Sequence, residues 1–393
     1  MFNEIELSSV ITDIAAGPFG SNLKVSCFVP HGFPIIDGAN LKGFKVTDNL
    51  TKFVTEDKAR SLGRSIARRG DVVVTISGTL GQIAYIPNDS MFEEYLCSQR
   101  QFRVSFDATR VYVPYLVFYF HTNEGQSKIL AFANQTGVPA LSQPLKNFKK
   151  IRIHLPSYDE QRRIASVIES INDKIDCNQK INDNLEQQAQ ALYKHYFPYS
   201  VGDELPDGWH IGSVGEIIEI HDSKRVPLSG AERAKMEKKT YPYYGAAALM
   251  DYVDDYIFDG KYLLLGEDGT VVDNAGYPIL QYVWGQFWVN NHAHILTGKL
   301  GFNVESLYML FKQTPVKAIV TGAVQPKISQ ANLRSIQVVI PPEKLLMEYN
   351  DRVEPLFTLL RSNEAENKSL TALRDSLLPK LMSGEIDVSG IQL

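Results

Sequence analysis

Two stretches, PSYDEQRRIASVIESINDKIDCNQKINDNLEQQAQALYKHY at residues 156–196 and PPEKLLMEYNDRVEPLFTLLRSNEAENKSLTALRDSLLPKL at residues 341–381, align along their whole length without a gap. In each, mostly apolar residues recur at alternating intervals of four and three, which is the pattern of a coiled-coil helix. Each pattern also holds two asparagines at matching places. The predicted seam consists of Ile164, Ile168, Ile171, Ile175, Asn178, Asn182, Leu185 and Leu192 in the first stretch, and Val353, Leu356, Leu360, Asn363, Asn367, Leu370 and Leu377 in the second.

The starts of both predicted helices are marked. Ser157 and Glu160 form a Ser-x-x-Glu capping box after a proline, and the second stretch begins Pro-Pro-Glu at 341–343. Pro355 lies inside the second stretch, where proline removes a backbone donor. We therefore expect a kink or an interruption of that helix at Pro355.

Two helices with matching apolar seams in one chain satisfy each other most simply by pairing. Seam asparagines set register and orientation, and their repetition favours an antiparallel pair with pseudo-two-fold symmetry. The alternative is that each helix packs separately on its own domain.

The segments before the two helices are rich in aromatic and β-branched runs with Gly and Pro punctuation, which predicts strands. They correspond weakly: Phe-Pro-Ile-Ile at 33–36 resembles Tyr-Pro-Tyr-Tyr at 241–244. We expect an α+β fold with two mixed α/β domains and two long antiparallel coiled-coil helices. The predicted boundaries are domain one at 1–155, a central helix at 156–199, domain two at 200–340 and a C-terminal helix at 341–393.

The composition is that of an ordinary globular protein. The chain has 393 residues, of which 44% are hydrophobic and 22% charged, and a net charge of −5 gives no hint of nucleic-acid binding. The three cysteines form no close pair, and no signal peptide or apolar run of about 18–20 residues is visible. We expect a cytoplasmic protein.

Several motifs resemble one family. These are LPSYDEQRRI at 155–164, LPDGW at 205–209 and the ending LLPKLMSGEI, together with segments of the two domains: GPFGSNLK at 17–24, GDVVVTISGTLG at 70–81, HDSKRVPLSG at 221–230, YPYYGAA at 241–247, LLLGEDG at 263–269 and FWVNNHAH at 287–294. In this order, over essentially the whole chain, they resemble the specificity subunit of Type I restriction-modification systems.

The resemblance implies a protein without a catalytic site and without a cofactor of its own. Each domain would be a target recognition domain that reads one half of a split double-stranded DNA sequence. The helices would hold the two domains apart and dock two methyltransferase subunits that use S-adenosylmethionine, which restriction (translocase-nuclease) subunits can join. Independently, the sequence contains no GxxxxGK[ST], GxGxxG, Asn-Pro-Pro-aromatic or GxSxG motif.

DNA contacts require cations for phosphates and amides or cations for base edges. Arg60, Arg64 and Arg68 are spaced as on one helical face, and a basic stretch at 146–152 precedes the first long helix. The candidate DNA-contacting residues are Ser21, Asn22, Lys24, Arg60, Arg64 and Arg68 in the first domain, and Lys224, Arg225, Tyr244, Asn291, His292, Gln325 and Lys327 in the second.

Two alternative functions belong to other classes of protein. His292 and His294 stand at i and i+2, so on a strand they would face the same side and could bind a metal in a nuclease. The other rival is a coiled-coil adaptor that never touches DNA. Glu267 and Asp268 form an adjacent acidic pair, which favours a turn over an acid-base pair.

The helix length suggests a ruler. Residues 164–196 would span roughly 50 Å at about 1.5 Å per residue, and DNA repeats about every 34–36 Å. We therefore expect the helices to set the spacer between half-sites and the loops to set the bases.

Overall fold

The computed structural model describes residues 3–134, 137–322 and 324–392. The chain divides into two units. The first unit takes 1–176 and 367–393, and the second unit takes 177–366. Both boundaries fall inside long helices, α5 (Tyr158–Tyr196) and α10 (Glu343–Met382), so each unit contains one part of each helix.

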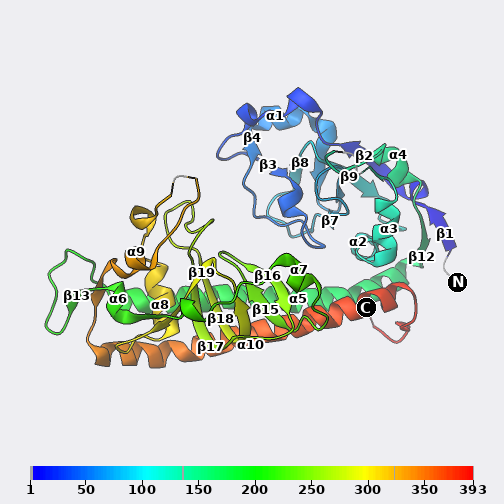
Figure 1. Ribbon diagram of the computed structural model, residues 1–393. Coiled ribbons are helices and arrows are strands. Elements are labelled where there is room, and N and C mark those ends of the chain that lie inside the picture. Colours follow the sequence, from blue (N-terminus) through cyan, green and yellow to red (C-terminus); the bar gives the residue numbers. More distant parts are fainter. Residues whose placement is uncertain (1–2, 135–136, 323, 393) are drawn as a thin grey trace. The chain divides into compact units, whose positions relative to one another are not determined.

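Within each unit the two long helices run antiparallel (Figure 1). In the second unit, Tyr349 donates to the carbonyl of Ala189 at 3.2 Å, and Asn363 bonds Asn182 at 2.8 Å. As the residue number increases along α10, the number of its partner residue on α5 decreases, so the two helices run in opposite directions. In the first unit, Arg374 bonds Asn172 at 3.1 Å. The predicted antiparallel pairing is confirmed.

None of the residues placed in the seam is exposed. The buried ones are Ile164, Ile168, Asn178, Asn182, Leu185, Val353, Leu360 and Asn363, and the half-buried ones are Ile171, Ile175, Leu192, Leu356, Asn367, Leu370 and Leu377. The pattern missed Phe357 and Leu378, which are buried one position beyond Leu356 and Leu377. Phe357 packs with Tyr282 and Met309 of the second unit's globular part, so this face of the helix is buried by more than its partner helix.

The expected interruption at Pro355 is wrong, because α10 continues through it. Pro355 and Asp351, whose carbonyl loses its helical donor, are both exposed. A free carbonyl on a solvent-facing helix surface can bond to water, which lowers the cost of an internal proline.

The first unit has two four-stranded sheets and several short helices. One sheet has the order β2-β9-β6-β7 and the other β4-β3-β8-β5. The strands are β2 (Ile11–Ala16), β9 (Gln101–Phe106), β6 (Val72–Thr75), β7 (Ile83–Tyr85), β4 (Phe53–Val54), β3 (Phe33–Ile36), β8 (Glu94–Cys97), β5 (Ile66–Arg68) and a small pair, β10 (Ala133–Asn134) with β11 (Ala140–Leu141). The helices are α1 (Glu56–Ser61), α2 (Val113–Phe120), α3 (Asn123–Leu130) and α4 (Pro144–Lys149).

The second unit is built on one six-stranded sheet in the order β14-β19-β17-β18-β15-β16. The strands are β14 (Ile218–Ile220), β19 (Ala293–Gly298), β17 (Phe258–Gly266), β18 (Leu280–Val289), β15 (Tyr241–Tyr244) and β16 (Leu249–Val253). Helix α8 packs on this sheet, and its residues Leu307 and Phe311 join Leu263 and Leu296 in one core. The helices are α6 (Val214–Ile217), α7 (Gly230–Ala234), α8 (Val304–Phe311) and α9 (Gln330–Arg334).

Each unit contains one corresponding pair of parallel strands. Ile35 and Ile36 of β3 face Leu96 and Cys97 of β8, and Tyr243 and Tyr244 of β15 face Trp288 and Val289 of β18. The correspondence read from the sequence between 33–36 and 241–244 is thereby confirmed. Residues after β8 and after β18 therefore occupy equivalent places in their units.

In each unit a two-stranded sheet leads into a long helix. β1 (Asn3–Glu6) pairs with β12 (Arg152–Leu155) before α5, and β13 (His210–Ser213) pairs with β20 (Gln337–Ile340) before α10. Ser157 caps α5 by accepting a bond from the Glu160 amide at 3.4 Å. In the part of the chain that the structure describes, every helix is too short or too polar to cross a bilayer.

Candidate nucleic-acid interface

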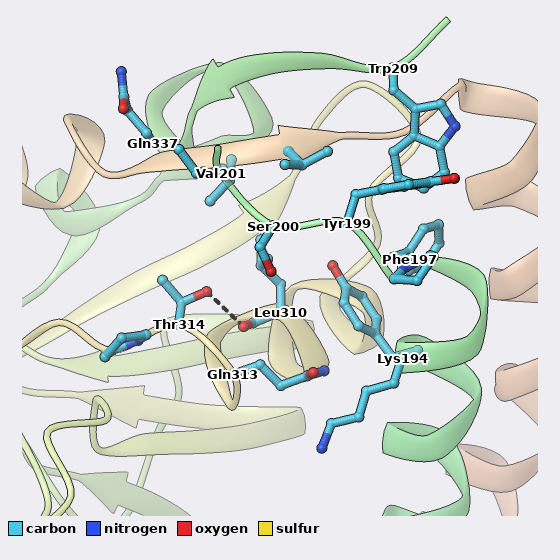
Figure 2. Close-up of a pocket in the computed structure, with 15 residues that line it drawn as sticks. Lys194, Phe197, Tyr199, Ser200, Val201, Trp209, Leu310, Gln313, Thr314 and Gln337 are labelled. Carbon is cyan, nitrogen blue, oxygen red and sulfur yellow. Dashed lines mark hydrogen bonds between the residues drawn. The ribbon is translucent and has the colours of Figure 1, made fainter. Parts of the chain in front are cut away.

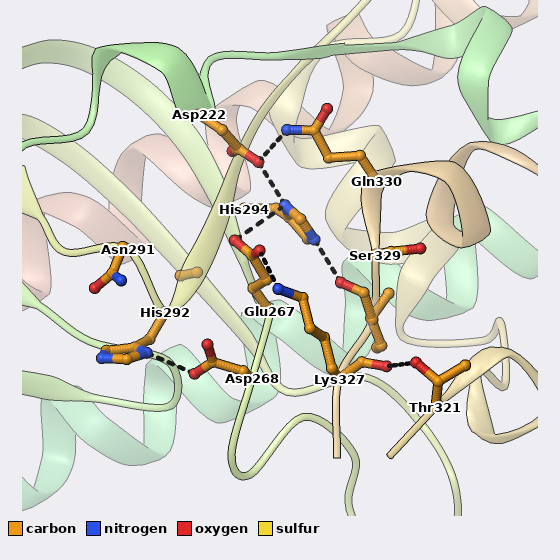
Figure 3. A network of polar contacts seen from close by, with 12 residues as sticks. Asp222, Glu267, Asp268, Asn291, His292, His294, Thr321, Lys327, Ser329 and Gln330 are labelled. Atoms are coloured by element: carbon orange, nitrogen blue, oxygen red, sulfur yellow. Dashed lines mark hydrogen bonds and ion pairs between the residues drawn. The ribbon is translucent and has the colours of Figure 1, made fainter. Parts of the chain in front are cut away.

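In the second unit, four loops from different parts of the chain meet at one end of the sheet. They follow β14 (221–225) and β17 (267–270), precede β19 (290–292) and precede α9 (325–329). Backbone bonds join them: the Glu267 amide donates to the carbonyl of His292, and the Ile328 amide donates to the carbonyl of Glu267, both at 2.8 Å. The loops carry the candidate residues Lys224, Arg225, Asn291, His292, Gln325 and Lys327. Figure 3 shows Asn291, His292 and Lys327 among them.

His294 lies under these loops and is fully buried. Its Nδ1 lies 2.6 Å from a carboxylate oxygen of Asp222, and its Nε2 lies 2.8 Å from the carbonyl oxygen of Ile328. Burial raises the pKa of Asp222, but the hydrogen bond and charge of His294 outweigh it and hold the pKa below its usual value. Both ring nitrogens are therefore engaged by acceptor oxygens from other loops, which holds the ring in one orientation.

Arg225 fastens the same loops. Its guanidinium bonds Glu267 at 2.6 Å and the carbonyls of Ala293 at 2.8 Å and Asn291 at 3.2 Å. The side chain is 13% exposed. Burial raises the pKa of Glu267, but the bond from Arg225 and the nearby positive charges hold it below its usual value. Arg225 is thus placed to shape the loops, and little of it faces outward.

The outer residues remain accessible. Lys224, Asn291 and Gln325 are exposed. Lys327 is half exposed and bonds Glu267 at 3.2 Å. Tyr244 is half-buried, its ring packs edge-on against Phe287, and burial raises its pKa to about 12. It lies on β15, and its carbonyl accepts from the amide of Asn290, which links it to the loop before β19.

The structure does not support the metal-nuclease interpretation of His292 and His294. His292 belongs to the turn before β19, not to the strand, and bonds Asp268 at 2.5 Å, whereas His294 points into the buried network. Asp222, Glu267 and His294 do bring potential metal ligands within 4.8 Å of one another. However, both His294 nitrogens are engaged, and the side chains of Arg225, Lys327 and Gln330 occupy the carboxylate oxygens. The cluster balances its own charge, which disfavours a divalent ion.

In the first unit, the loop at 17–24 is held by the residues that follow β8. Gln99 donates from Nε2 to the carbonyls of Gly20 and Leu23, both at 2.7 Å. The Gly17 amide donates to the carbonyl of Gln101 at 2.8 Å. Ser21, Asn22 and Lys24 are exposed on this loop. The loop borders a cavity of about 680 Å³ whose walls include Lys52, Thr75, Gln82, Ser98, Gln99, Arg100 and Gln101.

The expected arginine face on one helix is wrong. Helix α1 ends at Ser61, before Gly63, so Arg60 lies on a helix, Arg64 on a 3-10 turn and Arg68 on β5. Arg60 and Arg68 both bond Glu94, at 2.5 and 3.0 Å. Arg64 and Asn22 line a second cavity of about 480 Å³. Of the three arginines, Arg64 is the one that the fold brings beside the loop at 17–24.

Sequence reasoning missed Gln99 and Arg100. They follow β8 as Asn291 and His292 follow β18, and both are exposed. Arg100 makes no ion pair with the residues that the structure describes. The available signal was the pair of matching apolar strands, 94–97 and 286–289, each followed by amide and basic residues.

Another cavity of the second unit, about 530 Å³, lies at the end of α5 (Figure 2). Its walls include Tyr193, Phe197, Tyr199, Trp209 and the end of α8. It shares no lining residue with the four loops of the candidate interface. Its aromatic character also differs from the polar cavity of the first unit, so we do not include it in the interface.

Comparisons with known proteins agree with this architecture. A family model described as "Type I restriction modification DNA specificity domain" matches twice, at residues 33–187 and 206–372. The MjaIX specificity subunit of a Type I restriction enzyme from Methanocaldococcus jannaschii is 24% identical over 365 residues, covering 85% of this chain and 82% of that protein. The putative type I restriction enzyme specificity subunit S.HindORF215P from Haemophilus influenzae is 33% identical over 127 residues, 32% of each protein.

A solved structure shares the fold. The crystal structure of a Type I restriction-modification S subunit from M. genitalium superposes with a TM-score of 0.53 at 17% identity, covering 97% of this chain and 96% of that one. The repeated family match spans both globular parts and most of both long helices. This chain therefore belongs to the Type I restriction-modification DNA specificity family.

Proposed function

We propose that this chain is the specificity subunit of a Type I restriction-modification complex, and that each unit reads one half of a split double-stranded DNA target. The single observation that carries the proposal is the convergence of loops at one end of the sheet in the second unit. There, exposed amide and basic side chains rest on a buried network that holds them in place. Rigidly held donors and acceptors of this kind suit base-edge recognition.

The first unit supports the same proposal with different residues. Its polar cavity and the loop at 17–24 are bordered by the residues that follow β8, the strand equivalent to the end of β18. At this equivalent place the first unit carries Gln99 and Arg100, and the second unit carries Asn291 and His292. Because these side chains differ, the two units would read different half-sites. The proposed target recognition domains are 1–155 and 200–340.

The chain itself would be non-catalytic and free of cofactors. Its partners would be two methyltransferase subunits using S-adenosylmethionine, docked along α5 and α10, and restriction (translocase) subunits. We expect the protein to act in the cytoplasm, on the DNA that it is proposed to read. The relatives are named as subunits of Type I restriction enzymes, which supports a role within an assembly.

The test is to co-express this chain with the methyltransferase encoded beside it and to map methylated adenines across the host genome. A split motif with one modified adenine on each strand is the expected result. A soluble complex that leaves no new methylation would overturn DNA reading and favour the adaptor.

A matched pair of variants sharpens this test. Lys224→Ala removes an exposed cation of the candidate interface, and Lys235→Ala removes an exposed cation outside the four loops. Methylation at limiting complex concentration should fall with Lys224→Ala and stay unchanged with Lys235→Ala. Equal effects would argue against this surface as the DNA interface.

A further inference from the structure

Phe19 stands at the tip of the loop at 17–24 with 80% of its surface exposed. Its neighbours Gly17, Pro18 and Leu23 are buried. An isolated exposed apolar residue is normal on a protein surface. Phe19 differs because of how firmly the loop beneath it is held and what surrounds it.

The loop has little freedom to withdraw the ring. Two bonds from Gln99 and one from the Gly17 amide fasten it to the segment after β8. The backbone also approaches closely there, because a Cβ at Gly17 would lie 1.8 Å from the carbonyl oxygen of Ser98. The Asn22 amide closes a turn on the carbonyl of Phe19 at 3.0 Å. A ring presented on such a loop loses little conformational entropy when it is buried by a partner.

Three cations lie on or beside the loop that carries the ring. Lys24 is exposed on the same loop, Arg64 lines one neighbouring cavity together with Phe19, and Arg100 lines the other. None of these three cations forms an ion pair with a residue in the described ranges. An apolar ring on a loop with unpaired cations on it and beside it matches a duplex, whose phosphates flank stacked bases, better than it matches an apolar protein surface.

We propose that Phe19 is a wedge that enters a base-pair step of the half-site read by the first unit. Aromatic and aliphatic wedges unstack a step at a cost of a few kcal/mol, which the contacts of the bent duplex offset. Lys24, Arg64 and Arg100 would bind phosphates near the opened step. Deformable steps such as TA and CA would then be favoured at that position without hydrogen bonds to their bases. This inference rests on the proposed function and adds a specificity-determining residue to it.

The experiment uses the complex with its methyltransferase and duplexes that carry 2-aminopurine, whose fluorescence rises on unstacking, at successive positions of both half-sites. The two target adenines, which the methyltransferase flips out of the stack, brighten in both half-sites and are set aside. Apart from them, the wild type should brighten one step, in one half-site only. Phe19→Ala should abolish that signal and raise Kd roughly ten-fold. Phe19→Leu, which keeps an apolar wedge, should retain part of both effects.

Met91→Ala is the matched control. Met91 is 70% exposed in the same unit but precedes β8, at the end of the strand away from the loop at 17–24. It should leave both the signal and Kd unchanged.

The possible failures are distinct. Specific binding without a brightened step, or with equal Kd for Phe19→Ala, overturns the wedge. A loss of affinity caused by thymine-to-uracil replacement, without any 2-aminopurine signal, would overturn it in favour of a methyl contact. A wild-type complex that does not discriminate its methylated motif from other DNA would overturn the proposed function, and the wedge with it.

Discussion

Asn363 donates a hydrogen bond from Nδ2 to Oδ1 of Asn182, 2.8 Å away, in the buried seam between α10 and α5. Asn182 in turn donates to the carbonyl of Leu360 at 3.3 Å. Helix α10 therefore satisfies both the oxygen and the nitrogen of the Asn182 amide, in a place where leucine would pack more favourably, and it does so at only one alignment of the helices.

Replacing one of these asparagines should be costly. Asn363→Ala leaves the buried Oδ1 of Asn182 without its donor, and we expect a loss of about 1–3 kcal/mol in unfolding free energy, measured by urea denaturation. The double change Asn182→Leu and Asn363→Leu should be more stable than either single variant. Additive effects of the two single changes in a double-mutant cycle would contradict the coupling.

Lys224 and Arg225 are adjacent but should behave differently. Lys224→Ala should leave the melting temperature unchanged and reduce the slope of log K against log salt for DNA binding by about 1, because an exposed phosphate contact is lost. Arg225→Ala should lower the melting temperature, because Glu267 and two backbone carbonyls lose their buried donor. Similar melting temperatures for the two variants would refute this division.

Glu267 should stabilise the second unit in a pH-dependent way. Its pKa in the folded state lies below its usual value, so the stability it adds is present above about pH 4.3 and is lost as pH falls through the folded-state pKa. Glu267→Gln should cost about 3 kcal/mol at pH 7, with a difference from wild type that narrows below about pH 4. Chemical denaturation across this range measures it. Glu237→Gln, at an exposed position, serves as the control. If the difference in unfolding free energy between Glu267→Gln and wild type stayed constant with pH, Glu267 would not be the source of the pH dependence.

The helices should act as a ruler for the DNA spacer. Inserting seven residues at 176/177 and seven at 366/367 preserves the seam pattern and lengthens both helices by about 10 Å. The spacer in the methylation motif should then grow by about three base pairs. An unchanged spacer would show that helix length does not set the distance between the half-sites. Insertion into one helix alone should prevent the two seams from aligning.

The helical part of the fold was predictable because its information is local and periodic. Ile164 and Ile168 are separated by one helical turn, and the repeat of the whole pattern at Tyr349 and Val353 identified the partner. Phe357 was missed because its neighbours belong to β18 and α8, which a heptad pattern does not include.

The candidate site was predictable only as a set of motifs. His294 lies 72 residues from Asp222 and 34 from Ile328, so its role depends on strand order that no local spacing reveals. Likewise, Glu94 joins Arg60 and Arg68 although these two stand on different elements. The spacing therefore predicted a single helical face for residues that the fold places on different elements.

The nesting of the second unit within the first has a consequence for synthesis on the ribosome. The core of the first unit includes Leu378, Leu381, Met382 and Val388, which pack with residues as early as Leu7. The second unit is complete at residue 366. The core of the segment translated first can therefore close only after the residues at 378–388 have been made, while the second unit can finish folding ahead of it.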